Sequence, residues 1–132
     1  MKHSTHMTAL LRHVTRARDF CRWLEQDGDQ LIAAAHLLGG PDWAFRAEGI
    51  VATARNGGPV SAKCKTLRAL SGLLHGCVAD RLEGSASWPR ISLDPDDPRA
   101  ITAMRCAEAL DRGLRAMEAL RLAGLNTRGV TA

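Results

Sequence analysis

The chain has 132 residues, enough for one domain that buries roughly two thirds of its unfolded surface. Its hydrophobic content of 45% and charged content of 24% exclude an intrinsically disordered protein, and the formal net charge is only +4. Three tryptophans, two phenylalanines and no tyrosine imply an aliphatic core, which favours helices over sheets. No apolar run approaches the roughly 18 residues of a membrane span.

The opening MKHSTHM is similar to what a cloning site leaves before a native start. We therefore expect residues 1–6 to be non-native or disordered. Residues 7–125 are expected to form one helical domain, and residues 126–132 a frayed tail.

Apolar residues at helical spacing predict a first helix over 5–26, ending at the turn signal Asp27-Gly28. Trp23 falls on its polar side near Arg16, and Phe20 lies on the border. Either another segment covers Trp23, or it is a binding anchor beside arginines, a pairing enriched in interface hot spots. The predicted inward stripe is Met7, Leu10, Leu11, Val14, Ala17, Cys21 and Leu24.

Two further helices are predicted over 29–38, with Asp29 as N-cap, and over 42–55, with a turn of Gly39-Gly40-Pro41 between them. Their spacing is that of a helix-turn-helix. However, the early residues of the second helix are acidic or apolar, which does not suit the reading of bases. Its inward residues are expected to be Trp43, Ala47, Ile50 and Ala54, with Phe45 on another side.

The stretch AAHLLGG resembles the phosphoacceptor stretch of histidine-phosphotransfer domains, which are four-helix bundles. In that family a solvent-facing histidine is followed by leucine and glycine at +2 and +4, and Leu38 and Gly40 stand at these offsets from His36. Gly39 departs from the lysine of the pattern. The resemblance implies that His36 is a phosphoacceptor; the alternative is a histidine that interacts favourably with the helix dipole.

The longest predicted helix covers 59–83, with Gly58 as N-cap, Pro59 at its first position and Gly84 at its end. Its apolar side is wide enough to need at least two partner helices. That side consists of Val60, Cys64, Leu67, Leu70, Leu74, Cys77, Val78 and Leu82.

Residues 84–97 lack a helical period, so we expect a long loop that Trp88, Ile91 and Leu93 hold against the bundle. A last helix is predicted over 98–123, with Asp97 as N-cap. Glu108 with Arg112, and Asp111 with Arg115, form acid-before-base pairs on its solvated side. Its inward stripe is Ala103, Cys106, Ala107, Leu110, Leu114, Met117 and Leu125. The expected fold is all-α, a small bundle of four to five amphipathic helices.

The four cysteines have no paired spacing and fall in or beside apolar stripes, which indicates small buried side chains in a reducing, cytoplasmic compartment. His75 and Cys77 diverge on a helix and cannot chelate a metal together. No phosphate loop or local catalytic motif is present, so no cofactor is expected.

Basic residues concentrate in residues 1–24 and 51–82, and acidic ones in 25–50. If the fold placed them on one surface, basic side chains of the first and central helices would bind nucleic acid. The alternative is two solvated faces neutralised by the acidic band. The residues concerned are Arg12, Arg16, Lys65 and Arg68.

These patterns predict a small, cytoplasmic, non-enzymatic module that binds another protein or a second copy of itself. The residues predicted to make this contact are Trp23, Arg16, Phe20 and Trp88. The alternatives are a nucleic-acid-binding protein and a phosphotransfer domain with His36, and an enzyme without a local motif also stays open.

Overall fold

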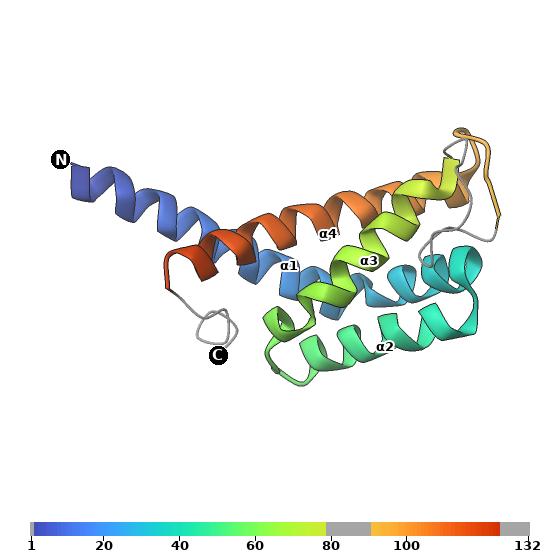
Figure 1. The fold of residues 1–132 in the computed structure, drawn as a ribbon, viewed down its shortest axis with the longest axis horizontal. Helices are drawn as coiled ribbons and strands as arrows, with labels where there is room; N and C mark the ends of the chain where they lie inside the picture. Colours follow the sequence, from blue (N-terminus) through green and yellow to red (C-terminus); the bar gives the residue numbers. More distant parts are fainter. Residues whose placement is uncertain (1, 79–90, 125–132) are drawn as a thin grey trace.

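The computed structural model describes residues 2–78 and 91–124, and all of its regular elements are helical, which confirms the all-α bundle (Figure 1). One-turn 3₁₀ segments precede and follow α3, at Val60–Lys63 and Gly76–Val78. The helices are α1 (Lys2–Gly39), α2 (Pro41–Arg55), α3 (Cys64–His75) and α4 (Pro98–Leu122).

Helix α1 is continuous, so the predicted break at Asp27-Gly28 is wrong. Gly28 is buried against α2, where an added Cβ would lie 2.5 Å from Val51 Cγ1. This glycine therefore allows two helices to approach closely instead of turning the chain. Asp29 is not an N-cap, and its carboxylate accepts a hydrogen bond of 3.3 Å from Arg55.

Replacing Gly28 by alanine is expected to destabilise the protein, because overpacking costs about 1–3 kcal/mol and outweighs the roughly 1 kcal/mol gain in helix propensity. Gly72 in α3 is the control, because nothing lies within 4 Å of an added Cβ there. Gly72→Ala should stabilise by about 0.5–1 kcal/mol. Urea unfolding followed by circular dichroism measures both changes, and a stabilising Gly28→Ala would contradict the close contact.

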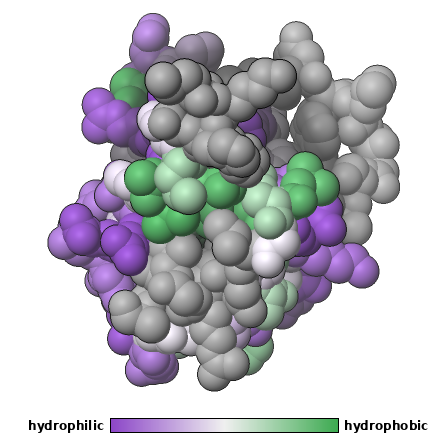
Figure 2. Space-filling view, turned by 90° about the vertical axis from the view of Figure 1, so that its left-hand side faces the viewer, coloured by the Kyte–Doolittle hydropathy of each residue, from purple (hydrophilic) through white to green (hydrophobic). Residues whose placement is uncertain are grey.

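The first turns of α1 extend beyond the other described helices (Figure 1). Met7 and Leu11 are 56% and 59% exposed, so their assignment to the core was wrong, although the deeper stripe residues Ala17, Cys21 and Leu24 are buried as predicted. The stripe simply continues past the point where a partner helix covers it. Figure 2 faces this end of the molecule and shows an apolar area between hydrophilic side chains.

Helices α1 and α2 form a tight hairpin across a single non-helical residue, Gly40. Its φ of 87° is in the region that favours glycine. The inward side of α2 is buried as predicted, whereas Phe45 on its opposite side is 76% exposed. The buried predicted residues are Trp43, Ala47, Ile50 and Ala54.

The central helix is shorter than the predicted range 59–83. It begins with a 3₁₀ turn after Pro59, and its α-helical part ends at His75, because Gly76, a poor helix former, begins a second 3₁₀ turn. Residues 79–83 lie outside the described residues. The apolar side is confirmed where its side chains are described: Val60, Leu67, Leu70, Leu74 and Cys77 are buried, and Cys64 is half-buried. The side chains of Val78 and Leu82 lie outside the description.

Helix α4 begins as predicted, because the Asp97 carboxylate accepts a 2.9 Å hydrogen bond from the Arg99 backbone N–H. Leu93 is buried and its N–H donates to the Cys77 carbonyl at 2.7 Å, so it holds the chain against the bundle. Ile91 is 38% exposed and does not, and Trp88 lies outside the described residues. The inward stripe is buried at Ala103, Cys106, Ala107, Leu110 and Met117, and half-buried at Leu114, while Leu125 also lies outside.

Helix α1 is the scaffold of the bundle, since it packs against both α2 and α4, and α4 also packs against α3. Helices α1 and α4 run antiparallel and form a long seam (Figure 1). In the part of the chain described here, no helix has the length and apolar character needed to cross a membrane.

Candidate binding pocket between α1 and α4

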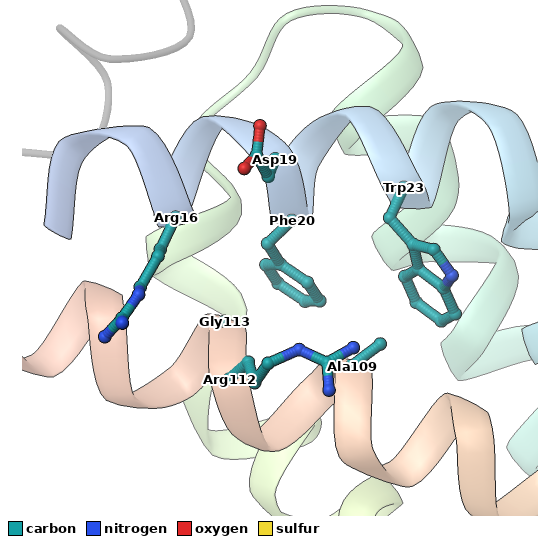
Figure 3. A pocket seen from close by; sticks show the side chains of 7 residues that line it. All are labelled: Arg16, Asp19, Phe20, Trp23, Ala109, Arg112 and Gly113. Atoms are coloured by element: carbon teal, nitrogen blue, oxygen red, sulfur yellow. The ribbon is translucent and has the colours of Figure 1, made fainter. Parts of the chain in front are cut away.

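A pocket of about 320 Å³ opens on the seam between α1 and α4 (Figure 3). Four of its residues come from α1 at helical spacing, and three come from one turn of α4. The lining residues are Arg16, Asp19, Phe20, Trp23, Ala109, Arg112 and Gly113.

Two aromatic rings form the apolar side of the pocket. Phe20 is 4% exposed and Trp23 is half-buried, and their rings are stacked with centroids 6.2 Å apart and an interplanar angle of 15°. Phe20 reaches this depth because Gly113 faces it: a Cβ at that position would overlap the ring. Both rings point from α1 towards α4 (Figure 3).

The polar rim of the pocket is basic. Arg16 from α1 and Arg112 from α4 are both exposed, and Asp19 supplies the single carboxylate among the lining residues. Figure 3 shows that the Arg112 side chain extends beside the aromatic pair, whereas the Asp19 carboxylate points away from α4. Guanidinium groups bind carboxylates through paired hydrogen bonds, and aromatic faces pack against apolar groups. The pocket therefore suits an anionic ligand that carries an apolar group.

The structure brings together three of the predicted interaction residues, Arg16, Phe20 and Trp23. Trp88 lies outside the described residues. Sequence reasoning missed Arg112 and Gly113, because it did not identify which helix faces Trp23. The sequence predicted only that Arg112 pairs with Glu108 on the solvated side of its helix, and this pairing does not indicate that Arg112 lies beside Trp23.

A second hollow of about 450 Å³ lies farther along the same seam, between the C-terminal half of α1 and the beginning of α4. Its α1 residues continue the helical spacing of the first pocket towards the C-terminus. The residues that line it are Gln30, Ala33, Ala34, Leu37, Pro98, Arg99 and Thr102.

The four basic residues predicted to bind nucleic acid lie on two helices. Arg12 and Arg16 are exposed on α1, and Lys65 and Arg68 are exposed on α3. Arg68 forms an ion pair with Glu118 of α4, with 3.4 Å between Nη2 and Oε2, which neutralises part of its charge. Nucleic-acid binding through these residues stays a prediction.

His36 is exposed in the last turn of α1, and its backbone carbonyl accepts a 2.8 Å hydrogen bond from the Gly40 N–H. Helix α1 ends at Gly39, so only three helical residues follow the histidine. Both interpretations of His36, as a phosphoacceptor and as a helix-end cation, stay predictions.

A cluster that the sequence did not reveal joins α3 to α4. Ser71 Oγ donates to Asp111 Oδ1 at 2.6 Å, and His75 Nε2 lies 2.6 Å from Asp111 Oδ2. Partial burial favours the neutral acid, but hydrogen bonds from Ser71 and His75 outweigh it and lower the pKa of Asp111. Asp111 is thus held by these partners, and the charge of Arg115, the partner that the sequence predicted, lowers the same pKa by a smaller amount.

The order of this cluster differs from that of a serine hydrolase triad. In a serine hydrolase triad the histidine lies between serine and carboxylate, so that it can remove the hydroxyl proton. Here the carboxylate lies between Ser71 and His75, and the hydroxyl is bound to Asp111. The cluster is a connection between two helices.

The cysteines are free, with three buried and Cys64 half-buried. Burial, with a smaller effect of a nearby carboxylate, raises the pKa of Cys21 and of Cys106 to about 11. These thiols are therefore poor nucleophiles at neutral pH. Within residues 2–78 and 91–124, no three potential metal ligands are grouped together.

Comparisons with protein-family models, with curated proteins and with solved structures found no match for this chain.

Proposed function

We propose that this chain is a non-enzymatic helical module that binds an acidic, partly apolar segment of a protein in the α1–α4 pocket. The observation that carries the proposal is the pair of arginines, one from each helix, beside the stacked rings of Phe20 and Trp23. Arginine and tryptophan are the residue types most enriched among interface hot spots.

The length of the seam favours a polypeptide ligand over a small molecule. The first pocket is centred near Phe20 and the second hollow near Ala34, about 21 Å apart along α1 at ~1.5 Å per residue. A peptide of about four helical turns spans this distance. The second hollow would take an apolar side chain, because Ala33, Ala34 and Leu37 line it.

Three candidate nucleophiles, Ser71, Cys21 and Cys106, have surroundings that support binding over catalysis. Ser71 is held by a carboxylate, and burial suppresses ionisation of the Cys21 and Cys106 thiols. Four free cysteines also support a reducing, cytoplasmic compartment as the place of action.

The proposal is tested with a fluorescein-labelled peptide of about 14 residues that carries one phenylalanine between aspartates, with binding followed by fluorescence anisotropy. The double variant Arg16→Glu/Arg112→Glu should weaken binding at least tenfold, or about 1.4 kcal/mol, because it places carboxylates where the peptide's own are bound. The matched control is Lys63→Glu/Lys65→Glu, which makes the same charge change at exposed positions near α3. It should leave affinity nearly unchanged.

Equal loss of affinity in the two double variants would contradict a specific pocket, since it would show general electrostatic attraction. The same variants test the nucleic-acid alternative with a random DNA duplex at low and high salt. Steeply salt-dependent duplex binding that both double variants weaken would favour that alternative, because Arg16 and Lys65 both belong to its predicted contact residues.

A further inference from the structure

The outer side of α2 has the properties that the pocket requires of a ligand. Phe45 is 76% exposed and is the most exposed of the large apolar side chains described. Asp42 and Glu48, both exposed, lie within one turn of it on the same side of the helix. The neighbouring positions on this side hold the small residues Gly49 and Ala52. The phenyl ring therefore projects from a low, acidic surface.

This surface and the pocket are complementary in charge and in shape. The pocket presents Arg16 and Arg112 beside two aromatic rings, whereas α2 presents two carboxylates beside one ring. Asp42 and Glu48 are separated by about 9 Å along the helix axis, at ~1.5 Å per residue. This separation places one carboxylate on each side of the phenyl ring.

We propose that α2 of one copy of this chain docks in the α1–α4 pocket of a second copy. Phe45 then packs against Phe20 and Trp23, and Asp42 and Glu48 lie next to Arg16 and Arg112. The inference rests on the proposed function of the pocket and identifies a ligand for its aromatic part; the second hollow stays outside this contact, because Phe45 is the one exposed large apolar side chain of α2.

The contact has to be intermolecular. Helix α2 uses Trp43, Ala47 and Ile50 to pack against the bundle, so Phe45 on its other side points away from it. The pocket lies where α1 meets α4, so the chain's own Phe45 cannot enter it. The two surfaces differ, so association gives either a dimer with two equivalent contacts or a longer chain of copies.

Two charge-reversed variants test this arrangement by sedimentation velocity. One variant, Arg16→Glu/Arg112→Glu, makes the pocket acidic, and the other, Asp42→Lys/Glu48→Lys, makes the α2 surface basic. Wild-type protein should associate in the micromolar range, and less at high salt. Each variant alone should associate at least tenfold more weakly, because its two surfaces then repel. An equimolar mixture should regain association, since every pocket again meets a surface of opposite charge.

All four substituted side chains are exposed, so the variants should keep the melting temperature of the wild type. Phe45→Ser is an independent variant that should also weaken association without any change of charge. Failure of the mixture to associate would overturn the proposal. Undiminished association of both charge-reversed variants would also overturn it. In that case, loss of association in the variant Met7→Lys/Leu11→Lys would show that copies contact one another through the apolar end of α1.

The anisotropy experiment separates the two proposals. Wild-type protein that stays monomeric at tens of micromolar but binds the acidic peptide would refute docking of α2 and leave the function of the pocket intact. A protein that does neither would refute both.

Discussion

Replacing Phe20 by alanine is expected to lower the free energy of unfolding by about 3–5 kcal/mol, the largest effect of a single substitution proposed for this protein. Phe20 is 4% exposed and fills the space that Gly113 leaves open in α4. Glycine cannot fill the cavity that the truncation creates, so α1 and α4 lose contact at the middle of their seam. Urea unfolding monitored by circular dichroism at 222 nm measures the change.

The protein supplies its own control, because its other phenylalanine, Phe45, is 76% exposed. Phe45→Ala removes the same atoms from solvent-facing α2 and should change stability by less than about 0.5 kcal/mol. Unfolding should be followed below the micromolar concentrations at which self-association is proposed. Similar losses for the two substitutions would show that the seam does not depend on the Phe20 ring.

The second largest effect is expected for Asp111→Ala, which should destabilise the protein by about 2–3 kcal/mol at neutral pH. The substitution removes the acceptor of two hydrogen bonds between α3 and α4, and charged acceptors contribute about 1.5–3 kcal/mol each before allowance for exposure. It also leaves the hydroxyl of Ser71, which is buried, without this partner. Glu108→Ala, at an exposed position of the same helix, should have little effect.

The contribution of Asp111 should depend on pH in a defined direction. Its pKa is lowered from an ordinary value of 3.8, so the folded state favours the carboxylate more than the unfolded state does. The stabilisation is therefore complete above the unfolded pKa and declines as the pH falls below about 3.8 through the folded pKa. Unfolding curves of wild type and Asp111→Ala should converge in acid. A difference that stays constant down to pH 2 would show that the ionised carboxylate is not what stabilises the fold.

Much of the fold followed from the spacing of apolar residues. The stripe with Leu67, Leu70 and Leu74 is buried as predicted, and Asp97 caps α4. The local sequence could not show whether the helix ends at Gly28. A glycine that ends a helix and a glycine that allows a neighbouring helix to approach have the same sequence signal. Only the position of Val51 across the contact distinguishes them.

The sequence predicted the α1 side of the candidate site but not its α4 side. Spacing on α1 placed Arg16 and Trp23 near Phe20, since all three lie within two helical turns. Arg112 and Gly113 lie on a different helix, about ninety residues later in the sequence. No local sequence pattern indicates which helices become neighbours. For the same reason the sequence predicted the charge interaction of Asp111 with Arg115 on its own helix, but not its hydrogen-bond partners, which lie on α3.

The two walls of the pocket are made at different times during synthesis on the ribosome. The aromatic wall leaves the exit tunnel early, as part of α1, whereas Arg112 and Gly113 emerge only with α4. A chain that ends at residue 97 contains α1 and α2 but lacks the α4 wall of the pocket. A ligand that needs both walls, such as the one proposed above, can therefore be bound only after α4 has been made.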